Sequence, residues 1–294
     1  MAGAIQDLTT VRQTKGPRRA TEEGPLVRWT LILLSVGFFA AFLLLPLVAV
    51  FAEGFRRGAA LYFQTFADPV TLDAIKLTLL TALIAVPANT LFGVAAAWAI
   101  TRFEFRGKQF FSTLIDLPLW VSPVIGGLVY VLLFGSQGVL GPWLQAHHWH
   151  IIYATPGIVI ATVFVTFPFV ARGLIPLMQA QGVAEEEAAL TLGARGWQVF
   201  LRVTLPKIKW GLLYGVILAN ARAMGEFGAV SVVSGHIRGL TNTVPLQIEI
   251  LYNEYAFAAA FALASLLSLL ALLTLGVKTY VEWRARQQLE QSQS

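Results

Sequence analysis

The sequence predicts an all-α membrane protein, a polytopic bundle of about six transmembrane helices with one polar helical loop between two of them. The chain of 294 residues is 56% hydrophobic and 13% charged, and its mean hydropathy is +0.68. A water-soluble domain of this length carries more charge and less apolar surface. Apolar runs long enough to cross a bilayer recur along the chain, and short basic clusters separate them. We therefore expect the chain to lie in a lipid bilayer.

Residues 1–28 are basic and contain two prolines, which predicts a tail outside the membrane. The first span is expected from Trp29 to Ala52, and it is uncleaved because its apolar run exceeds the ~7 to 15 residues of a signal peptide. The second span runs from about Leu77 to Ile100, with a kink at Pro87. The third, Pro118 to Phe134, is expected to be short and irregular because it contains proline and small residues.

The fourth span is expected from Gly157 to about Met178, the fifth from Trp210 to about Val233 and the sixth from Phe257 to Val277. A re-entrant or outer segment joins the last two. The polar residues 279–294 form a C-terminal tail. Residues 29–278 therefore make one transmembrane domain, and no soluble domain fits in the chain.

The distribution of basic residues predicts the orientation. Most of the 21 Lys and Arg residues fall in the N-terminal tail, the loop after the second span, the region between the fourth and fifth spans, and the C-terminal tail. The opposite side holds only Arg56, Arg57, Lys76 and Arg238. Because loops rich in Lys and Arg stay in the cytoplasm, we expect both termini and the loop 182–206 to be cytoplasmic.

Composition excludes several functions. The formal net charge of +5 comes from clusters between apolar runs, so it does not indicate a nucleic-acid-binding face. The absence of cysteine excludes disulfides, thiolate metal sites and a thiol nucleophile. His147, His148 and His150 lack an i, i+4 pair and nearby carboxylates, so we expect a solvated loop and no metal.

Motifs for catalysis are missing as well. Gly107-Lys108 is followed by Gln109 and lacks the upstream glycine of a phosphate-binding loop. The patterns H-E-x-x-H and G-x-S-x-G do not occur. We therefore expect no catalytic residue and no cofactor, and a membrane enzyme would lack both a nucleophile and a metal centre.

The loop 182–206 is predicted to form a helix, a turn and a second helix. Three glutamates at 185–187 suit the positive end of the first helix. Gly193 and Gly196 bracket the turn. The second helix is expected to end at Pro206 and to carry an apolar stripe of Trp197, Phe200, Leu201 and Thr204. An amphipathic helix at the membrane interface, without a partner, is the alternative.

A longer pattern in this loop favours a partner. Glu187-Ala188-Ala189, Gly193 and then Val203-x-Leu205-Pro206 resemble the EAA loop of ABC-importer permeases, with Val203 in place of isoleucine. The resemblance implies a type I importer permease whose coupling helices bind a separate cytoplasmic ATPase subunit. The implied docking residues are Glu187, Ala188, Ala189 and Gly193.

The fifth predicted span contains two ionisable residues, Arg222 and Glu226, four positions apart on one helical face. Charges inside a membrane face a partner or a water-filled path. Two roles are open: a mutually satisfied pair that holds the helix against a neighbour, or a place on a translocation path. Both can hold together.

The segment Ala221-Arg-Ala-Met-Gly-Glu-Phe-Gly228 resembles sulfate and molybdate permeases, and Asp116-Leu-Pro118 and Pro245-Leu-Gln-Ile-Glu249 favour the sulfate group. From the first span to Arg286 the chain resembles the W-type permeases of sulfate/thiosulfate importers. The resemblance implies import across the inner membrane of a bacterial cell. The implied partners are a T-type permease in a heterodimer, two ATP-binding subunits and a periplasmic sulfate-binding protein.

The path residues expected for an oxyanion are hydroxyls and one positive charge, namely Ser122, Ser231, Ser234 and Arg222, with Glu226 beside the arginine. Molybdate or another oxyanion is the alternative substrate. An ion-coupled secondary transporter is the alternative mechanism, for which one expects internal repeats and acids near mid-membrane. Of the acids only Glu226 qualifies, and no repeat is visible.

Overall fold

The computed structural model describes residues 25–293, and the chain divides into two compact units, Met1–Ala49 and Val50–Ser294. In its described part the first unit holds α1 (Pro25–Phe39), the π-helical turn η1 (Ala40–Leu44) and the start of α2 (Leu45–Phe55). Leu26–Phe55 is long and apolar enough to span a membrane. The first span therefore extends about one turn beyond the predicted 29–52 at each end. Most of the predicted tail, residues 1–24, lies outside the described residues.

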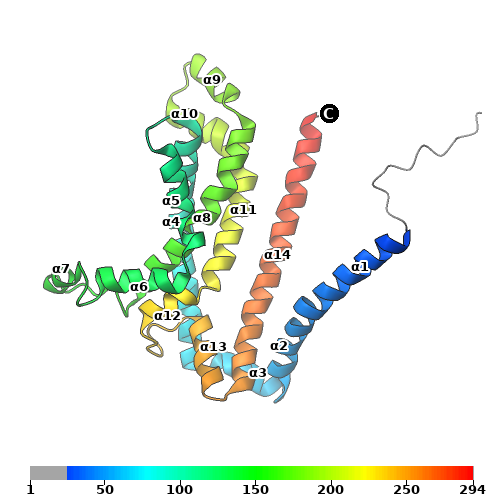
Figure 1. The fold of residues 1–294 in the computed structure, drawn as a ribbon, viewed down its shortest axis with the longest axis vertical. Helices are drawn as coiled ribbons and strands as arrows, with labels where there is room; N and C mark the ends of the chain where they lie inside the picture. Colours follow the sequence, from blue (N-terminus) through cyan, green and yellow to red (C-terminus); the bar gives the residue numbers. More distant parts are fainter. Residues whose placement is uncertain (1–24, 294) are drawn as a thin grey trace, which may run out of the picture. The chain divides into compact units, whose positions relative to one another are not determined.

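The second unit holds the remaining helices. In chain order these are α3 (Ala59–Ala67), α4 (Pro69–Arg102), α5 (Lys108–Trp120), α6 (Pro123–Phe134), α7 (Gly141–Ala146), α8 (Thr155–Gln181), α9 (Ala184–Thr191), α10 (Gly196–Val199), the π-helical turn η2 (Phe200–Thr204), α11 (Leu205–Met224), α12 (Gly228–Ser234), α13 (Val244–Asn253) and α14 (Phe257–Gln293). Figure 1 shows α9 and α10 at one end of this unit, with the C-terminal end of α14, and α3 and α13 at the other.

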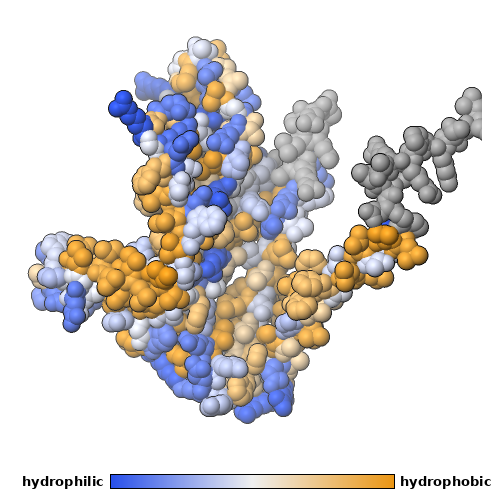
Figure 2. Space-filling view, viewed as in Figure 1, coloured by the Kyte–Doolittle hydropathy of each residue, from blue (hydrophilic) through white to orange (hydrophobic). Residues whose placement is uncertain are grey.

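Four helical stretches in the described residues are long and apolar enough to cross a membrane, the first of them Leu26–Phe55. The other three are α4, α8 and most of α14. Two bent pairs add to these: α5 with α6 at 107°, and α10 to α11 with α12 at 50°. Counting each bent pair as one span gives six, so the predicted all-α bundle is confirmed. Apolar surface covers much of the unit between its two ends, and hydrophilic residues gather at those ends (Figure 2).

The predicted third and fifth spans are both interrupted. The third is irregular, as predicted, but it is longer than 118–134, because α5 and α6 join at Val121 and Ser122. Ser122 has an extended backbone with ψ of 132°, because the following proline disfavours the helical conformation in the residue before it. The fifth is interrupted at 225–227, where Gly225 ends α11. The predicted tail 279–294 instead continues α14 as a helix as far as Gln293.

Pro206 does not end a helix, contrary to the prediction. The helical chain runs through it from Gly196 to Met224, and the π-helical turn η2 precedes it. In η2 the N–H of Leu205 bonds to the carbonyl of Phe200, five residues back. This wider turn relieves the clash between the proline ring and the carbonyl four residues earlier. The same arrangement occurs at η1, which also precedes a Leu-Pro pair.

Close backbone approach holds the centre of the second unit together, where α4, α8 and α11 pack against one another. Val170 of α8 is fully buried between two glycines. A Cβ on Gly93 of α4 would lie 2.7 Å from the Val170 Cβ, and one on Gly215 of α11 would lie 3.1 Å from the Val170 Cα. Small residues permit this packing in a bilayer, where burial from lipid gives little driving force.

We predict that Gly93→Ala destabilises the protein, because the stiff, β-branched Val170 has no room to move away. Overpacking of this kind costs about 1–3 kcal/mol, which lowers the melting temperature of the purified protein in detergent. Gly276→Ala in α14 is the control, since a Cβ there meets nothing within 4 Å. Equal melting temperatures for the two variants would contradict the packing argument.

Candidate functional site

The α9 loop lies where the EAA-like pattern predicts it. Gly182, with φ of +66°, precedes α9, and Gly193, with φ of +85°, follows it. All three glutamates at 185–187 occupy the first turn of α9, as predicted. Glu187, Ala188 and Gly193 are exposed, and Ala189 is half-buried.

Two large apolar side chains lie close in sequence to these predicted docking residues. Leu190 is 52% exposed and Leu192 is 88% exposed. Together with Glu187, Ala188 and Gly193 they form what we call the α9 surface. Large exposed apolar side chains on a polar loop are compatible with a protein-binding surface.

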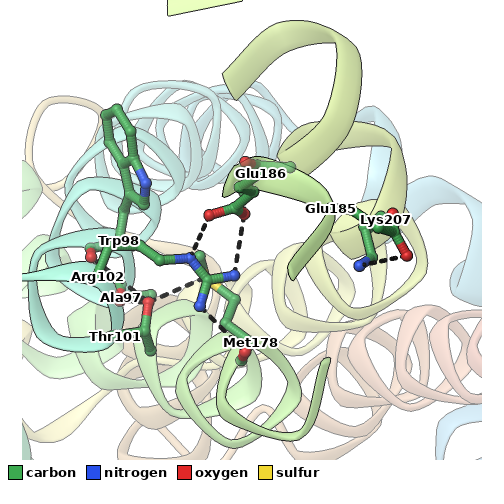
Figure 3. Close-up of polar contacts among 9 residues, drawn as sticks. Ala97, Trp98, Thr101, Arg102, Met178, Glu185, Glu186 and Lys207 are labelled. Atoms are coloured by element: carbon green, nitrogen blue, oxygen red, sulfur yellow. Dashed lines mark hydrogen bonds and ion pairs between the residues drawn. The ribbon is translucent and has the colours of Figure 1, made fainter. Parts of the chain in front are cut away.

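One buried ion pair fixes α9 to the bundle (Figure 3). The Nε of Arg102, at the end of α4, lies 2.7 Å from Oε2 of Glu186, and its Nη2 donates to Oε1 at 3.0 Å. The hydroxyl of Thr204 in η2 also donates to Oε1, at 2.8 Å. The Nη1 of Arg102 donates to the carbonyl of Met178 in α8 at 3.3 Å. We call this group the Arg102 cluster, and it joins α4, α8, α9 and η2.

The Arg102 cluster has the geometry of a strong pair. The two side chains are only 10% and 12% exposed. Both carboxylate oxygens lie close to the guanidinium, and the contact of Nη2 with Oε1 is a charge-assisted hydrogen bond, whereas Nε has no hydrogen-bond geometry. A second pair, between Lys207 and Glu185 at 2.9 Å, is much more open, with the glutamate 65% exposed. The middle glutamate of the three is therefore the one that anchors the helix.

The apolar stripe predicted for the second helix of the loop is wrong. Trp197 and Leu201 are exposed, and of the four residues only Thr204 is buried. Val199 is buried instead. The π-helical turn adds a residue to the turn, so a stripe spaced for an α-helix does not stay on one face.

The two broken spans meet next to their breaks. A Cβ on Gly228, at the start of α12, would lie 3.0 Å from the Cβ of Pro123, at the start of α6. One on Gly127 of α6 would lie 2.7 Å from the carbonyl oxygen of Ala229. Non-helical backbone inside a membrane is tolerated where protein or a water-filled cavity surrounds it. The crossing of α6 and α12 is therefore a candidate part of a translocation path.

Glu226 lies in the second break rather than on a helical face with Arg222, which corrects the prediction. It is 2% exposed, and its Oε1 accepts a hydrogen bond from the N–H of Ala229 at 3.0 Å. Its Oε2 lies 2.9 Å from Nη2 of Arg222, whose side chain is 38% exposed. The structure thus brings the predicted pair together across the break between α11 and α12.

The predicted serines have different surroundings. Ser122 lies exposed in the first break. The hydroxyl of Ser231 donates to the carbonyl of Gly228 at 2.9 Å, and that of Ser234, which is buried, accepts from the N–H of His236 at 3.2 Å. Two of the three hydroxyls are therefore already bonded to backbone of their own segment.

His147, His148 and His150 are all exposed, and the ring of His147 bonds to the carbonyl of Trp143. Among the described residues no group of three His, Cys, Asp or Glu side chains has a metal-binding arrangement.

A family model matches residues 89–287, which include the Arg102 cluster, the α9 surface and both breaks. Its description is a binding-protein-dependent transport system inner membrane component. The chain belongs to this family. It is therefore a membrane permease component of an ABC importer, as the EAA-like pattern predicted, and not an enzyme.

Similar proteins agree with this family. The chain is 52% identical over 266 residues to the sulfate transport system permease protein CysW of Escherichia coli (strain K12), which covers 90% of this chain and 91% of that protein. It is 37% identical over 241 residues to the permease protein CysT of the same organism, covering 82% and 87%. A solved bacterial alginate ABC transporter has the same fold, with a TM-score of 0.72 at 18% identity over 89% of this chain and 94% of that one.

The sequence alone did not point to the Arg102 cluster. In the sequence Arg102 is one of several basic residues that predict orientation, and Glu186 is one of three glutamates at a helix start. No local pattern joins them, because they are 84 residues apart in the chain. The nearest signal is their position, since each lies at the end of a helix on the predicted cytoplasmic side.

We predict that Glu186→Gln loosens α9, because it leaves the guanidinium of Arg102 buried without a counter-charge. Breaking a buried pair costs about 3 kcal/mol, which corresponds to about a hundredfold faster hydrogen exchange of the α9 amides. The matched control is Glu185→Gln, whose exposed pair contributes about 1 kcal/mol at most. Similar exchange rates in the two variants would show that the cluster does not anchor α9.

Proposed function

We propose that the chain is one permease subunit of an ATP-driven importer that carries sulfate or thiosulfate across the bacterial inner membrane. The observation that carries this proposal is the identity of 52% to a sulfate permease protein over nine tenths of both chains. The exposed α9 surface and the charged break between α11 and α12 supply the two parts that a permease needs. One is a docking site for an ATPase, and the other is a charged segment inside the membrane.

The proposed partners follow from the same relatives. In Escherichia coli two sulfate permease proteins, named CysW and CysT, both resemble this chain. Two related permeases suit a heterodimer in which each subunit forms half of the path, and we propose a T-type permease as the partner. Two cytoplasmic ATP-binding subunits and a periplasmic sulfate-binding protein complete the proposed assembly.

The proposed orientation places α9 in the cytoplasm. The α9 loop, the end of α4 and the C-terminal end of α14 lie at one end of the second unit (Figure 1), and the basic loops belong to this end. Residues 1–28 are assigned to the same side by their charge, and residues 29–278 to one permease domain.

We propose that ATPase closure moves the α9 surface together with Ala189, and that the docking residues are Glu187, Ala188, Ala189 and Gly193. The Arg102 cluster passes this motion to α4, α8 and η2 at once. The guanidinium of Arg102 on α4 bonds to Met178 of α8 and to Glu186 of α9, and Glu186 also accepts a hydrogen bond from Thr204 of η2. Rigid elements joined in this way transmit a small displacement at one end of a bundle to the other.

The proposed path passes the crossing of α6 and α12. Arg222 supplies a positive charge for an oxyanion, and Glu226 holds the guanidinium in place from its buried position. Ser122 is exposed in the break before α6, whereas Ser231 and Ser234 contribute only if they release their backbone partners.

Two alternatives remain distinguishable by experiment. Molybdate or another oxyanion is the alternative substrate. An ion-coupled secondary transporter is disfavoured because the chain belongs to a binding-protein-dependent family and because Glu226, its one candidate for ion coupling, is already paired with Arg222.

The test is import by the assembly reconstituted in proteoliposomes. We expect ATP-dependent uptake of labelled sulfate, and stronger stimulation of ATP hydrolysis by sulfate or thiosulfate than by molybdate in the presence of the binding protein. Preferential stimulation by molybdate would reject the sulfate assignment. Uptake by this chain alone, driven by an ion gradient, would reject the importer.

We predict that Glu187→Lys and Gly193→Val each abolish most ATP-driven uptake without affecting insertion of the chain. The first reverses a charge on the α9 surface, and the second places a β-branched residue at φ of +85°. Co-purification of the ATPase subunit measures docking. Glu104→Lys is the control, since Glu104 is 89% exposed and lies in the neighbouring basic loop; normal uptake in both test variants would contradict the docking assignment.

We predict that Arg222→Gln lowers sulfate uptake by about tenfold or more, because it removes the positive charge at the break. This variant also leaves Glu226 buried without a counter-charge, so the double variant Arg222→Gln with Glu226→Gln is measured beside it. If the double variant assembles normally and imports at the normal rate, Arg222 has no place on the path.

A further inference from the structure

A second ion pair lies within the spans, away from both breaks. It joins Arg172 of α8 to Asp116 of α5, with Nε 2.8 Å from Oδ1 and Nη2 donating to Oδ2 at 3.3 Å. Neither residue has a part in the function proposed above. Both carboxylate oxygens lie against the guanidinium, and the contact of Nη2 with Oδ2 has hydrogen-bond geometry.

The pair is placed well inside the membrane by its positions in the two helices. Arg172 precedes the end of α8 at Gln181 by nine residues, about 14 Å at the helical rise. Asp116 follows the start of α5 at Lys108 by eight residues, about 12 Å. These similar distances place the two residues at similar depth. Since the hydrocarbon core is about 30 Å thick, that depth lies in the half of the membrane nearest α9.

The pair is also open to its surroundings. The Arg172 side chain is 54% exposed and that of Asp116 is 25% exposed, although half of the apolar window of α8 is buried. A charged group on a lipid-facing surface is costly, and such residues face a bundle interior or a water-filled cavity. Arg172 does not extend to the membrane surface to escape the lipid, because it bonds to a carboxylate at its own depth.

The two intramembrane pairs differ in how firmly the carboxylate is held. Glu226 is buried, and its other oxygen accepts a backbone hydrogen bond, so its carboxylate is held in place beside Arg222. Asp116 is partly exposed, and among the described residues its carboxylate bonds only to Arg172. A tetrahedral oxyanion presents two oxygens to a guanidinium much as a carboxylate does. Asp116 therefore occupies the position that a transported anion would take.

We propose that Arg172 is a second anion-binding residue for the transported oxyanion, in the half of the path nearest α9, and that Asp116 is an internal competitor that the oxyanion displaces. This inference rests on the proposed function. Transport requires binding that is favourable enough for entry and weak enough for release. A carboxylate that competes for the same fork provides the release.

The absence of cysteine from the chain makes a single-cysteine reporter direct. Leu119→Cys places a thiol on α5 one turn beyond Asp116, farther from the α9 end, at a position that is 40% exposed. The complete assembly, with the other subunits made cysteine-free, is reconstituted in proteoliposomes and treated with a charged, water-soluble thiol reagent. Leu273→Cys on α14, 63% exposed, is the control for a lipid-facing position.

We expect labelling at Leu119→Cys in at least one nucleotide state, slowed by sulfate and not by chloride, and little labelling at Leu273→Cys. Adding Arg172→Gln should raise the half-protecting sulfate concentration by about tenfold or more, as expected for loss of a charge-assisted contact. Adding Asp116→Asn should lower it, because the competitor is gone. Arg172→Lys, which keeps the charge and loses the fork, should lie between the parent and Arg172→Gln.

The half-protecting sulfate concentration should rise in Arg172→Gln and fall in Asp116→Asn, and these opposite changes distinguish anion binding from a structural brace. A brace is broken equally by Arg172→Gln and Asp116→Asn, so shifts in the same direction would overturn the inference. Absence of labelling at Leu119→Cys in every nucleotide state would overturn it too, since the pair would then be sealed. If the parent assembly imports sulfate but sulfate does not slow labelling of Leu119→Cys, this anion site is rejected and the proposed function still stands. Failure of the parent assembly to import sulfate rejects the proposed function itself.

Discussion

Ionisable side chains in a membrane protein are costly unless they are paired or face water. Three arginine–carboxylate pairs organise the second unit, one at its α9 end and two within the spans: Arg102 with Glu186, Arg172 with Asp116, and Arg222 with Glu226. The first ties the α9 loop to the bundle, the second ties α5 to α8, and the third spans the break after α11. The α9 loop, α5, α8 and the break after α11 are thus held by ion pairs. An ion pair between side chains can open while the helices that carry it stay folded.

Much of the architecture could be predicted from the sequence, because composition and turn chemistry act locally. Long apolar runs identify the spans, glutamates identify the start of α9, and Gly193 marks its end with a backbone conformation that glycine adopts freely. The pairings could not be predicted. Three consecutive glutamates look alike in a sequence, and which of them turns toward Arg102 depends on how α9 docks on α4 and α8. That docking is a property of the whole bundle.

The breaks and the π-helical turns escaped prediction for a different reason. An apolar run of the right length has the same composition whether its backbone is straight or bent by 107°. Pro206 was expected to end a helix, yet the wider turn of η2 lets the helix continue. Beyond such a turn the side chains are rotated by about 100° relative to an unbroken α-helix. A helical projection of Gly196–Met224 therefore assigns the wrong faces after residue 200.

The glycine contacts on both sides of Val170 have a mechanical consequence. With backbone so close to side chain on α4 and α11, the three central helices have little free volume between them, and close-packed interiors of this kind compress very little. A push applied at one end of these helices is not absorbed by sliding between them. Such a push is passed along the helices to their ends, and the breaks at 121–122 and 225–227 are the nearest places within the spans where the backbone is not helical.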